Sequence, residues 1–387
     1  MKKNLRIAYI SEMRMPTERA HGIQIMRTCE SLSLSGADVT LYYSRRKQIN
    51  KSLENVNPYE YFDVTENFTL KDVYYLDVLV IEKFIKPILN PLMFLANAVF
   101  AITSMAVAKK WNPDIYYTRH WLCATVLILL GNPVGFELHR AGSNEFTGRA
   151  LKIISLLSKS KNMRFISTIS NELKTNLLSL GVSKNKIFVL PDALPNYNLQ
   201  KNSKLNSSEN DVVYTGHLVR GRGVDVLLKA AKLLPKVRFT IVGGNEKDRD
   251  NLIKTFQPDK NVIFVNHIPP SEVKIYQISA KILVLPQTDI HGQSPLKLFE
   301  YIASKKPIIA TNLNPIKEIL EDEFSALLFN PGDFSQLAKY ISKLLDDDEL
   351  RNYLSENASQ KYKHWTWENR SKNIINIIES GQQRLCK

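Results

Sequence analysis

The sequence is poor in cysteine and contains no cysteine pattern that would hold a metal ion or a disulfide network. Only Cys29, Cys123 and Cys386 occur among the 387 residues, and they lie far apart in the chain. No two of them form a CxxC pair, so a zinc ribbon and a disulfide-stabilised scaffold are both excluded. A reducing, cytoplasmic environment fits this cysteine usage best.

From the sequence we expect neither a secretory leader nor a membrane-spanning helix. Its start, MKKNLRIAYI, is basic, but the apolar run that follows is only as long as a strand, which is too short for a signal peptide. Residues 87–108 carry no charge and approach the length of a span, but prolines and polar side chains interrupt them. This composition favours a helix that is buried or faces a membrane over one that crosses it.

Acidic residues are in the minority. The chain has 38 Asp and Glu against 52 Lys and Arg, which gives a net charge of +14. Such a balance favours anionic partners: nucleic acid, an anionic membrane surface or phosphorylated ligands. Arginine-rich arms and helix-turn-helix signals are missing, which speaks against nucleic acid. A basic binding module for nucleic acid or anionic membrane stays open as an alternative, and strongly salt-dependent DNA affinity without enzymatic turnover would favour it.

Strand and helix patterns alternate along two stretches of the chain. Expected strands of the first stretch lie at 5–11, 38–44, 114–118, 134–139, 164–170 and 186–191, and a helix is expected from about Ile23 to Ser35. Six further strand patterns follow from Asp211: DVVYTG, VRFTIVGG, NVIFVN, KILVLP, PIIAT and ALLFN. Strands that alternate with helices imply parallel sheets with right-handed crossovers. The sequence therefore predicts an α/β protein with two doubly wound, Rossmann-like domains.

One polar segment separates the two stretches and sets the domain boundaries. We expect a first domain at 1–195, a linker rich in Asn and Ser at 196–210, a second domain at 211–365 and a C-terminal helix at 366–387. The last helix either closes the second domain or crosses back to the first. The two domains would face each other across a cleft at the carboxyl ends of their strands, where α/β folds bind ligands.

The turn GHLVRGRG, residues 216–223, is the first candidate site of the second domain. A glycine-rich turn between a strand and a helix exposes backbone N–H groups to an anion. His217, Arg220 and Arg222 add side-chain donors, and the planar guanidinium suits phosphate. The spacing is neither a Walker motif nor GxGxxG, so an ordinary turn with solvated arginines is an equal alternative.

The segment HGQSPLKLFEYIASKKPIIAT, residues 291–311, is the second candidate. A helix begins near Pro295, so the amides around Ser294 would be unpaired where the helix dipole favours negative charge. Lys297 strengthens this anion site, and Glu300 suits the hydroxyl groups of a ribose. Phosphate and ribose together indicate a nucleotide, and the alternative is a surface Lys–Glu pair at i,i+3.

In the first domain, candidate residues lie at strand ends and at one helix start. Gly22 lies between a loop and a helix, where a backbone without a side chain could approach a ligand. His139 ends the expected strand VGFELH, and Arg119 and His120 follow another strand. A strand-end histidine that faces a cleft is a better functional candidate than a core histidine.

Together these segments resemble the retaining nucleotide-sugar glycosyltransferases of family 4, also called group 1, which have the GT-B fold. The resemblance covers essentially the whole chain and is carried by YTGHLVRGRGVDVLLKAAKLLP, FTIVGG, SPLKLFEYIASKKPIIAT, PTERAHGIQI and FELH. It implies metal-independent transfer of a sugar, with retention, from a nucleoside diphosphate sugar to the hydroxyl of a glycan or lipid-linked acceptor. The expected setting is cell-surface polysaccharide or glycolipid synthesis in the cytoplasm, with contact to the inner face of the membrane. Another GT-B enzyme, of the epimerase or phosphorylase type, is the alternative within this fold.

The resemblance also implies roles for donor-site residues in the second domain. Arg222 stands where the family has the lysine of its KG motif, which contacts the donor diphosphate, and Gly216 opens the same turn. Lys297 and the amides around Ser294 match the donor-phosphate loop. Glu300 matches the second glutamate of the E-x7-E motif, a ribose ligand in relatives. By this resemblance Arg222 and Lys297 would also stabilise charge during the reaction.

The remaining correspondences include two departures. Gly22 matches the glycine of the first loop, and His139 matches the histidine near the transferred sugar. His217 stands where the family usually has the arginine of GRL, and Gly292 stands where the first glutamate of E-x7-E would fall. That glutamate usually touches the donor sugar, so the identity of the sugar does not transfer. The acidic run 346–348 lies between expected helices and is interpreted as a solvated turn.

Overall fold

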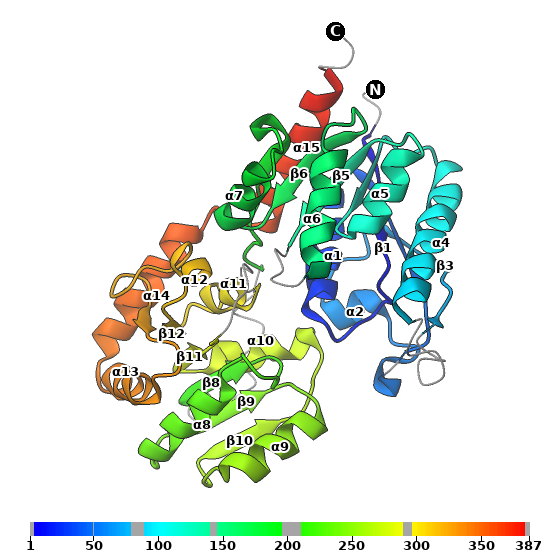
Figure 1. Ribbon diagram of the computed structural model, residues 1–387. Helices are drawn as coiled ribbons and strands as arrows, with labels where there is room; N and C mark the ends of the chain where they lie inside the picture. The colour runs from blue at the N-terminus through cyan, green and yellow to red at the C-terminus, as the bar shows by residue number, and fades with distance from the viewer. Residues whose placement is uncertain are drawn as a thin grey trace. The chain divides into compact units, whose positions relative to one another are not determined.

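The computed structural model describes residues 4–48, 50–78, 89–139, 145–195, 210–288 and 296–383 of the chain. The chain divides into two compact units (Figure 1). Unit 1 comprises Met1–Pro191 and Trp367–Lys387, and unit 2 comprises Asp192–Thr366. The second unit thus begins just ahead of the expected linker at 196–210, and the C-terminal helix belongs to unit 1.

Unit 1 is built on one parallel sheet of seven strands. They are β1 (Arg6–Ser11), β2 (Asp38–Arg45), β3 (Thr69–Tyr74), β4 (Ile115–Thr118), β5 (Val134–Leu138), β6 (Met163–Thr168) and β7 (Ile187–Val189). Their order is β3-β2-β1-β4-β5-β6-β7, so the winding direction reverses between β1 and β4. The carboxyl ends of such a strand pair form the crevice where doubly wound folds bind ligands.

Helices cover both faces of this sheet. One face carries α1 (Ala20–Leu34), α2 (Pro58–Phe62) and α15 (Trp367–Gln383), and the other carries α4 (Leu89–Lys109), α5 (Trp121–Leu129), α6 (Glu145–Leu157) and α7 (Asn171–Ser179). Short 3-10 helices lie at Lys51–Leu53 and Lys184–Lys186. The helix expected from Ile23 begins earlier, at Ala20, so that Gly22 lies inside its first turn. The strand β3 was not predicted.

Helix α4 contains most of the uncharged stretch at 87–108. It buries one side, including Ala96, Phe100 and Ala101, while Phe94 and Ile102 remain about half exposed, at 49% and 47%. Its segment Asn90–Lys109 has a mean hydropathy of 1.8, and 28% of it is buried. Among the described helices it alone is long and apolar enough, by length and composition, to cross a membrane.

Unit 2 repeats the same architecture with six parallel strands. They are β8 (Val212–Thr215), β9 (Phe239–Val242), β10 (Val262–Val265), β11 (Ile282–Leu285), β12 (Ile308–Thr311) and β13 (Leu327–Phe329), in the order β10-β9-β8-β11-β12-β13. All six lie within the strands that the sequence predicts. Central strands are buried on both faces and therefore read as continuous apolar runs. The winding reverses between β8 and β11.

Two helical layers also cover the sheet of unit 2. One layer contains α8 (Val224–Leu233), α9 (Glu246–Phe256) and α13 (Phe334–Asp346), and the other contains α10 (Pro270–Ser279), α11 (Leu296–Ala303) and α12 (Asn314–Lys317). Helix α14 (Asp348–Tyr362) packs against both α11 and α13. The predicted α/β class, with two doubly wound parallel sheets and helices at the C-terminal end of the chain, is confirmed.

Candidate functional site

The glycine-rich turn of unit 2 follows β8, at the strand pair where the winding reverses. Gly216 has a φ of 142°, and a Cβ there would lie 2.0 Å from Nζ of Lys297. Gly223 has a φ of 74°, and a Cβ there would lie 1.6 Å from the carbonyl oxygen of Pro286, which follows β11. Both positions therefore require glycine. The turn is thus packed against the segments that follow β11.

Lys297 lies in the first turn of α11, within electrostatic reach of a second cation, Arg222. Its Nζ is 4.6 Å from the centroid of the Tyr214 ring, which is within the range of a cation–π contact. Burial and the nearby charge of Arg222 lower the pKa of Lys297 to about 7, while Glu300 acts in the opposite direction. An anion bound at this site would favour the charged form of the lysine.

The turn itself is fixed by a hydrogen bond to the strand before it. The Tyr214 hydroxyl donates to the carbonyl of His217 over 2.8 Å. Arg220 is exposed, whereas Arg222 is partly buried. Of these two arginines, Arg222 is the one whose charge influences the pKa values of Tyr214 and Lys297. Arg222 is therefore the arginine of this turn that belongs to the site, and Arg220 is a solvated neighbour.

The carboxylate of Glu300 is held by a buried amide. Gln277, on α10, donates through Nε2 to Oε2 of Glu300 over 3.1 Å and to the Thr215 hydroxyl over 3.1 Å. The backbone N–H of Thr215, at the end of β8, donates to the Tyr301 hydroxyl over 3.0 Å. These bonds tie α10 and α11 to the end of β8. The carboxylate consequently has a defined position relative to the glycine-rich turn.

Four of the predicted donor-site residues thus come together in unit 2: Gly216, Arg222, Lys297 and Glu300. Ser294 and Gly292 lie outside the described residues. The sequence did not point to Tyr214, which contacts Lys297, or to Gln277, which donates to Glu300. One feature of the sequence could have pointed to Gln277. It is a polar residue on the buried side of a helix, and buried polar residues usually have a hydrogen-bond partner.

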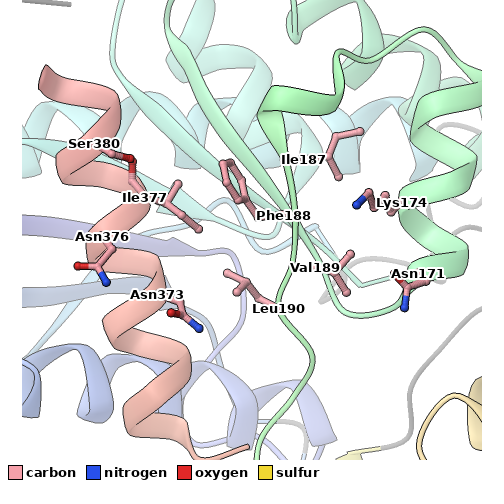
Figure 2. Close-up of a pocket in the computed structure, with 10 residues that line it drawn as sticks. All are labelled: Asn171, Lys174, Ile187, Phe188, Val189, Leu190, Asn373, Asn376, Ile377 and Ser380. Carbon is pink, nitrogen blue, oxygen red and sulfur yellow. The ribbon is translucent and has the colours of Figure 1, made fainter. Parts of the chain in front are cut away.

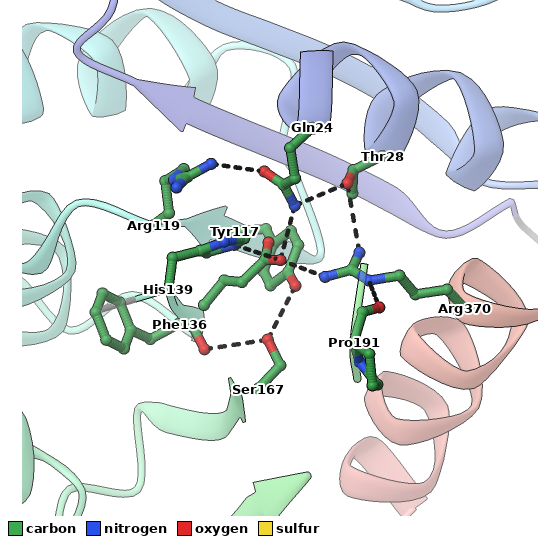
Figure 3. Close-up of polar contacts among 10 residues, drawn as sticks. Gln24, Thr28, Tyr117, Arg119, Phe136, His139, Ser167, Pro191 and Arg370 are labelled. Carbon is green, nitrogen blue, oxygen red and sulfur yellow. Dashed lines mark hydrogen bonds and ion pairs between the residues drawn. The ribbon is translucent and has the colours of Figure 1, made fainter. Parts of the chain in front are cut away.

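In unit 1, His139 follows directly after β5 and contacts a buried carboxylate. Its Nε2 lies 2.8 Å from Oε1 of Glu137 (Figure 3). Arg119, at the end of β4, donates to Oε1 of Gln24 over 2.8 Å, and Gln24 also bonds Glu137. His120 instead caps the N-terminus of α5 through its side chain. Arg119 therefore joins the polar network around His139, whereas His120 stabilises a helix end.

The glycine at position 22 is explained by packing within unit 1. A Cβ there would lie 2.6 Å from Cγ2 of Thr17 and 2.7 Å from the ring of Phe62. The close approach that the sequence indicates is therefore made to protein side chains. A contact of Gly22 with a donor stays a prediction.

The acidic run 346–348 lies where α13 ends and α14 begins. Asp347, in the acidic run 346–348, accepts the N–H of Leu350 and caps α14. Asp348 pairs with Arg351. Among the residues that the structure describes, no three His, Cys, Asp or Glu side chains gather as a metal site.

A surface pocket of about 600 Å³ lies elsewhere in unit 1 (Figure 2). It is lined by Asn171 and Lys174 of α7, by the edge strand β7, and by Asn373, Asn376 and Ser380 of α15. The predicted site residues do not line it. The pocket belongs to the edge of the sheet rather than to the strand pair β1/β4, where the winding reverses.

Comparison with known sequences identifies related enzymes. Residues 196–361 match the sequence model of the family described as Glycosyl transferases group 1. An uncharacterized glycosyltransferase of Haemophilus influenzae is 29% identical over 178 residues, which are 44% of this chain and 49% of that protein. The capsular polysaccharide biosynthesis glycosyltransferase CapM of Staphylococcus aureus is 25% identical over 222 residues, 55% of this chain and 57% of that protein. The chain thus spans about half the length of these curated relatives.

Comparison with solved structures agrees on the fold. HepE of Anabaena, solved in complex with UDP and glucose, aligns with a TM-score of 0.74 at 14% identity, over 97% of this chain and 100% of that one. Identity this low shows the fold alone, which is GT-B. The family match covers the glycine-rich turn and the helix with Lys297 and Glu300. Residues 196–361, which are less than half of the chain, are thus similar to the group 1 glycosyltransferases, and the chain as a whole has the GT-B fold.

Proposed function

We propose that this protein is a retaining glycosyltransferase that moves a sugar from a nucleoside diphosphate sugar to an acceptor hydroxyl. The observation that carries the proposal is the juxtaposition of two cations and one fixed carboxylate in unit 2. Nζ of Lys297 lies against Gly216, the charge of Arg222 from the same turn acts on the lysine, and Glu300 is held one helical turn away from it. Two adjacent cations suit a diphosphate, and a carboxylate suits the diol of a ribose.

In the proposed reaction, the bond between the anomeric carbon and the diphosphate oxygen breaks. The acceptor oxygen bonds to that carbon on the same face, and the acceptor proton passes to the departing diphosphate. The developing negative charge is what Arg222 and Lys297 would stabilise. Charges that are fixed before the reaction stabilise a transition state without further reorganisation. HepE, which shares the fold, was solved with UDP and glucose, in keeping with a nucleotide-sugar donor here.

Further residues complete the proposed site. We assign the ribose contact to Glu300, backbone contacts with the diphosphate to the amides near Ser294, and a backbone contact with the donor to Gly22. His139 is the residue of unit 1 that we assign to the transferred sugar. These assignments rest on the resemblance to the family and, for Glu300, on the bond that orients its carboxylate.

The acceptor that fits best is a glycan or a lipid-linked sugar of a cell-surface polysaccharide. The relative CapM is named for capsular polysaccharide biosynthesis. The exposed Phe94, Leu95 and Ile102 of α4, together with the net charge of +14, favour contact with an anionic membrane surface. We therefore place the enzyme in the cytoplasm, at the inner face of the membrane.

A thermal-shift screen with UDP-sugars and GDP-sugars tests the donor site, because a ligand that binds the native state raises the unfolding temperature. We expect one class of nucleotide sugar to stabilise the wild type, and to stabilise R222A, K297A and E300Q much less. The matched control is R220A, which removes the exposed arginine of the same turn and keeps the stabilisation. Equal stabilisation of all four variants, or no stabilisation of the wild type, would overturn the proposal.

Two further experiments separate the alternatives. Release of product only in the presence of an added acceptor distinguishes a transferase from an epimerase-like or phosphorylase-like enzyme. Co-sedimentation with anionic liposomes at low salt tests the membrane contact, and a protein that stays in the supernatant contradicts it. Salt-dependent DNA binding without nucleotide-sugar turnover would favour the basic binding module instead.

A further inference from the structure

Unit 1 contains a carboxylate in the middle of an apolar layer. Glu137 is fully buried, and it lies on the same side of β5 as Gly135, since side chains alternate along a strand. A Cβ at Gly135 would touch the rings of Phe165 and Tyr117. These rings belong to the core that α1 and α15 cover. A charge in such a layer is costly unless it is paired.

Donors from two helices converge on this carboxylate, and Figure 3 shows both of them, Gln24 and Arg370. Gln24 of α1 donates through Nε2 to Oε1 of Glu137 over 2.8 Å. Arg370 of α15 donates to the same oxygen through Nη2. Nε2 of His139 lies 2.8 Å from it. One carboxylate oxygen therefore links the first turns of α15, the N-terminal half of α1 and the residue that follows β5.

Arg370 is itself fixed on several sides. Its Nε donates to the carbonyl of Pro191 over 3.0 Å, and its Nη1 donates to the Thr28 hydroxyl over 3.3 Å. Its guanidinium lies 5.5 Å from the centroid of the Trp367 ring. The guanidinium thus holds Glu137 from a rigid position on the C-terminal helix.

The network keeps Glu137 ionised. Burial alone would raise the pKa of Glu137, but Arg370, His139 and Arg119 together hold it well below its usual range. The neighbouring Tyr9 and Tyr117 hydroxyls stay neutral, because burial and the Glu137 charge both raise their pKa. The carboxylate is therefore a permanent acceptor beside the imidazole.

Docking of α15 does not require this ion pair. Ile374 and Ile378 already bury the apolar side of α15 against the same core, and buried ion pairs add little to stability compared with apolar residues of similar volume. The position of the Glu137 carboxylate indicates a role other than docking of α15. Glu137 and His139 are two residues apart and so lie on the same side of the chain, at the carboxyl edge next to the strand pair β1/β4.

We propose that Glu137 is a positioning residue for His139, and that Arg370 fixes Glu137 in the orientation that this requires. The inference rests on the proposed function, since it takes His139 as the residue of unit 1 that contacts the transferred sugar. The carboxylate keeps a proton on Nε2 and sets the plane of the ring. The C-terminal helix thereby becomes part of the reaction site, through the carboxylate rather than through contact with the substrate.

The decisive test is an NMR titration of the histidine C2–H signals, which needs no substrate. H139A identifies the His139 signal among the seven histidines. We expect its titration midpoint to fall by about one pH unit in E137Q, because an adjacent opposite charge favours the protonated ring. The double variant E137Q/R370M also removes the nearby positive charge of Arg370, so its midpoint should fall less than that of E137Q. An unchanged midpoint in E137Q would overturn the proposal.

Kinetics separate this proposal from a purely structural role. With the nucleotide sugar that the wild type hydrolyses or transfers, E137Q should lose about tenfold in kcat with little change in KM. A structural role predicts that E137Q/R370M regains wild-type kcat together with stability, whereas the positioning role predicts that kcat stays low. I374V, which loosens α15 without touching the network, is the matched control and should keep wild-type kcat. A wild type without any turnover, but with the NMR shift in E137Q, would contradict the proposed function and leave the pairing established.

Discussion

The two units share one topology but differ in how their buried charges are balanced. In unit 2, the positive charge of Arg222 acts on Lys297, and burial together with this charge lowers the pKa of the lysine to about 7. In unit 1, Arg370 meets the carboxylate of Glu137 and is further bonded by main chain and side chain. Two neighbouring cations are better suited to an external anion than a completed pair is. The same fold therefore carries the proposed donor site in one unit and, in the other, a paired polar network that we propose orients His139.

The largest effect is expected from breaking the completed pair of unit 1. R370M leaves Glu137 buried without its main counter-charge, and removing one partner of a buried pair typically costs about 3–5 kcal/mol. E137Q/R370M should regain most of this loss, because neither charge remains. Urea unfolding followed by tryptophan fluorescence measures both. Equal stability of R370M and the wild type would show that the pair is not coupled as described.

The next largest effect is expected from removing a cation of unit 2. K297A should weaken binding of the donor by about 2 kcal/mol, or roughly 30-fold, which is typical of a lost charged hydrogen bond. The free energy of unfolding should not fall, because the substitution removes a positive charge that is repelled by Arg222. Calorimetric titration with the donor and urea unfolding check the two statements. If K297A lost as much stability as R370M, the proposed difference between the buried charges of the two units would be contradicted.

The pH dependence of unit 2 should have opposite signs for binding and for folding. Above pH 7 the free protein must take up a proton on Lys297 to bind an anion, so donor affinity should fall by up to about tenfold at pH 8. The unfolded lysine, with a pKa of about 10.4, binds more protons than the folded one between about pH 7 and 10, so stability of the free protein rises with pH across this window. K297M should show neither trend. Affinity that is flat from pH 6.5 to 8.5 would contradict the lowered pKa.

The smallest effect is expected from the amide that orients the carboxylate. Q277L removes the bond to Glu300 and should weaken UDP binding by about 1 kcal/mol, or roughly fivefold. Affinity for pyrophosphate, which has no ribose, should not change. The ratio of the two affinities, measured by calorimetry, isolates the ribose contact. An equal loss for both ligands would show that Gln277 supports the fold of the site rather than Glu300.

The sheets were predictable because their strands are apolar runs. All six strands of unit 2 were found from apolar segments such as ILVL. β3 was missed for a physical reason: it is an edge strand, and Lys71 and Asp72 interrupt its apolar pattern. Edge strands often carry charge, so their composition resembles that of a loop.

The site was predictable only where its residues cluster along the sequence. Lys297 and Glu300 share one helix, and Gly216 and Arg222 share one turn. The contact between Arg370 and Glu137 spans 233 residues, and spacing within a sequence carries no information about such a pair. Gln277 was missed for the same reason, because its partners lie on other elements.

The central claim is that unit 2 binds a nucleoside diphosphate through Lys297 and Arg222. Calorimetric titration with UDP and GDP at pH 7.5, repeated in buffers of different ionisation enthalpy, tests it most directly. We expect one nucleotide to bind the wild type and R220A with net uptake of protons. We expect K297A and R222A to bind that nucleotide much more weakly, and K297A to show no proton uptake. Absence of binding by the wild type, or equal affinity in all four proteins, would contradict it.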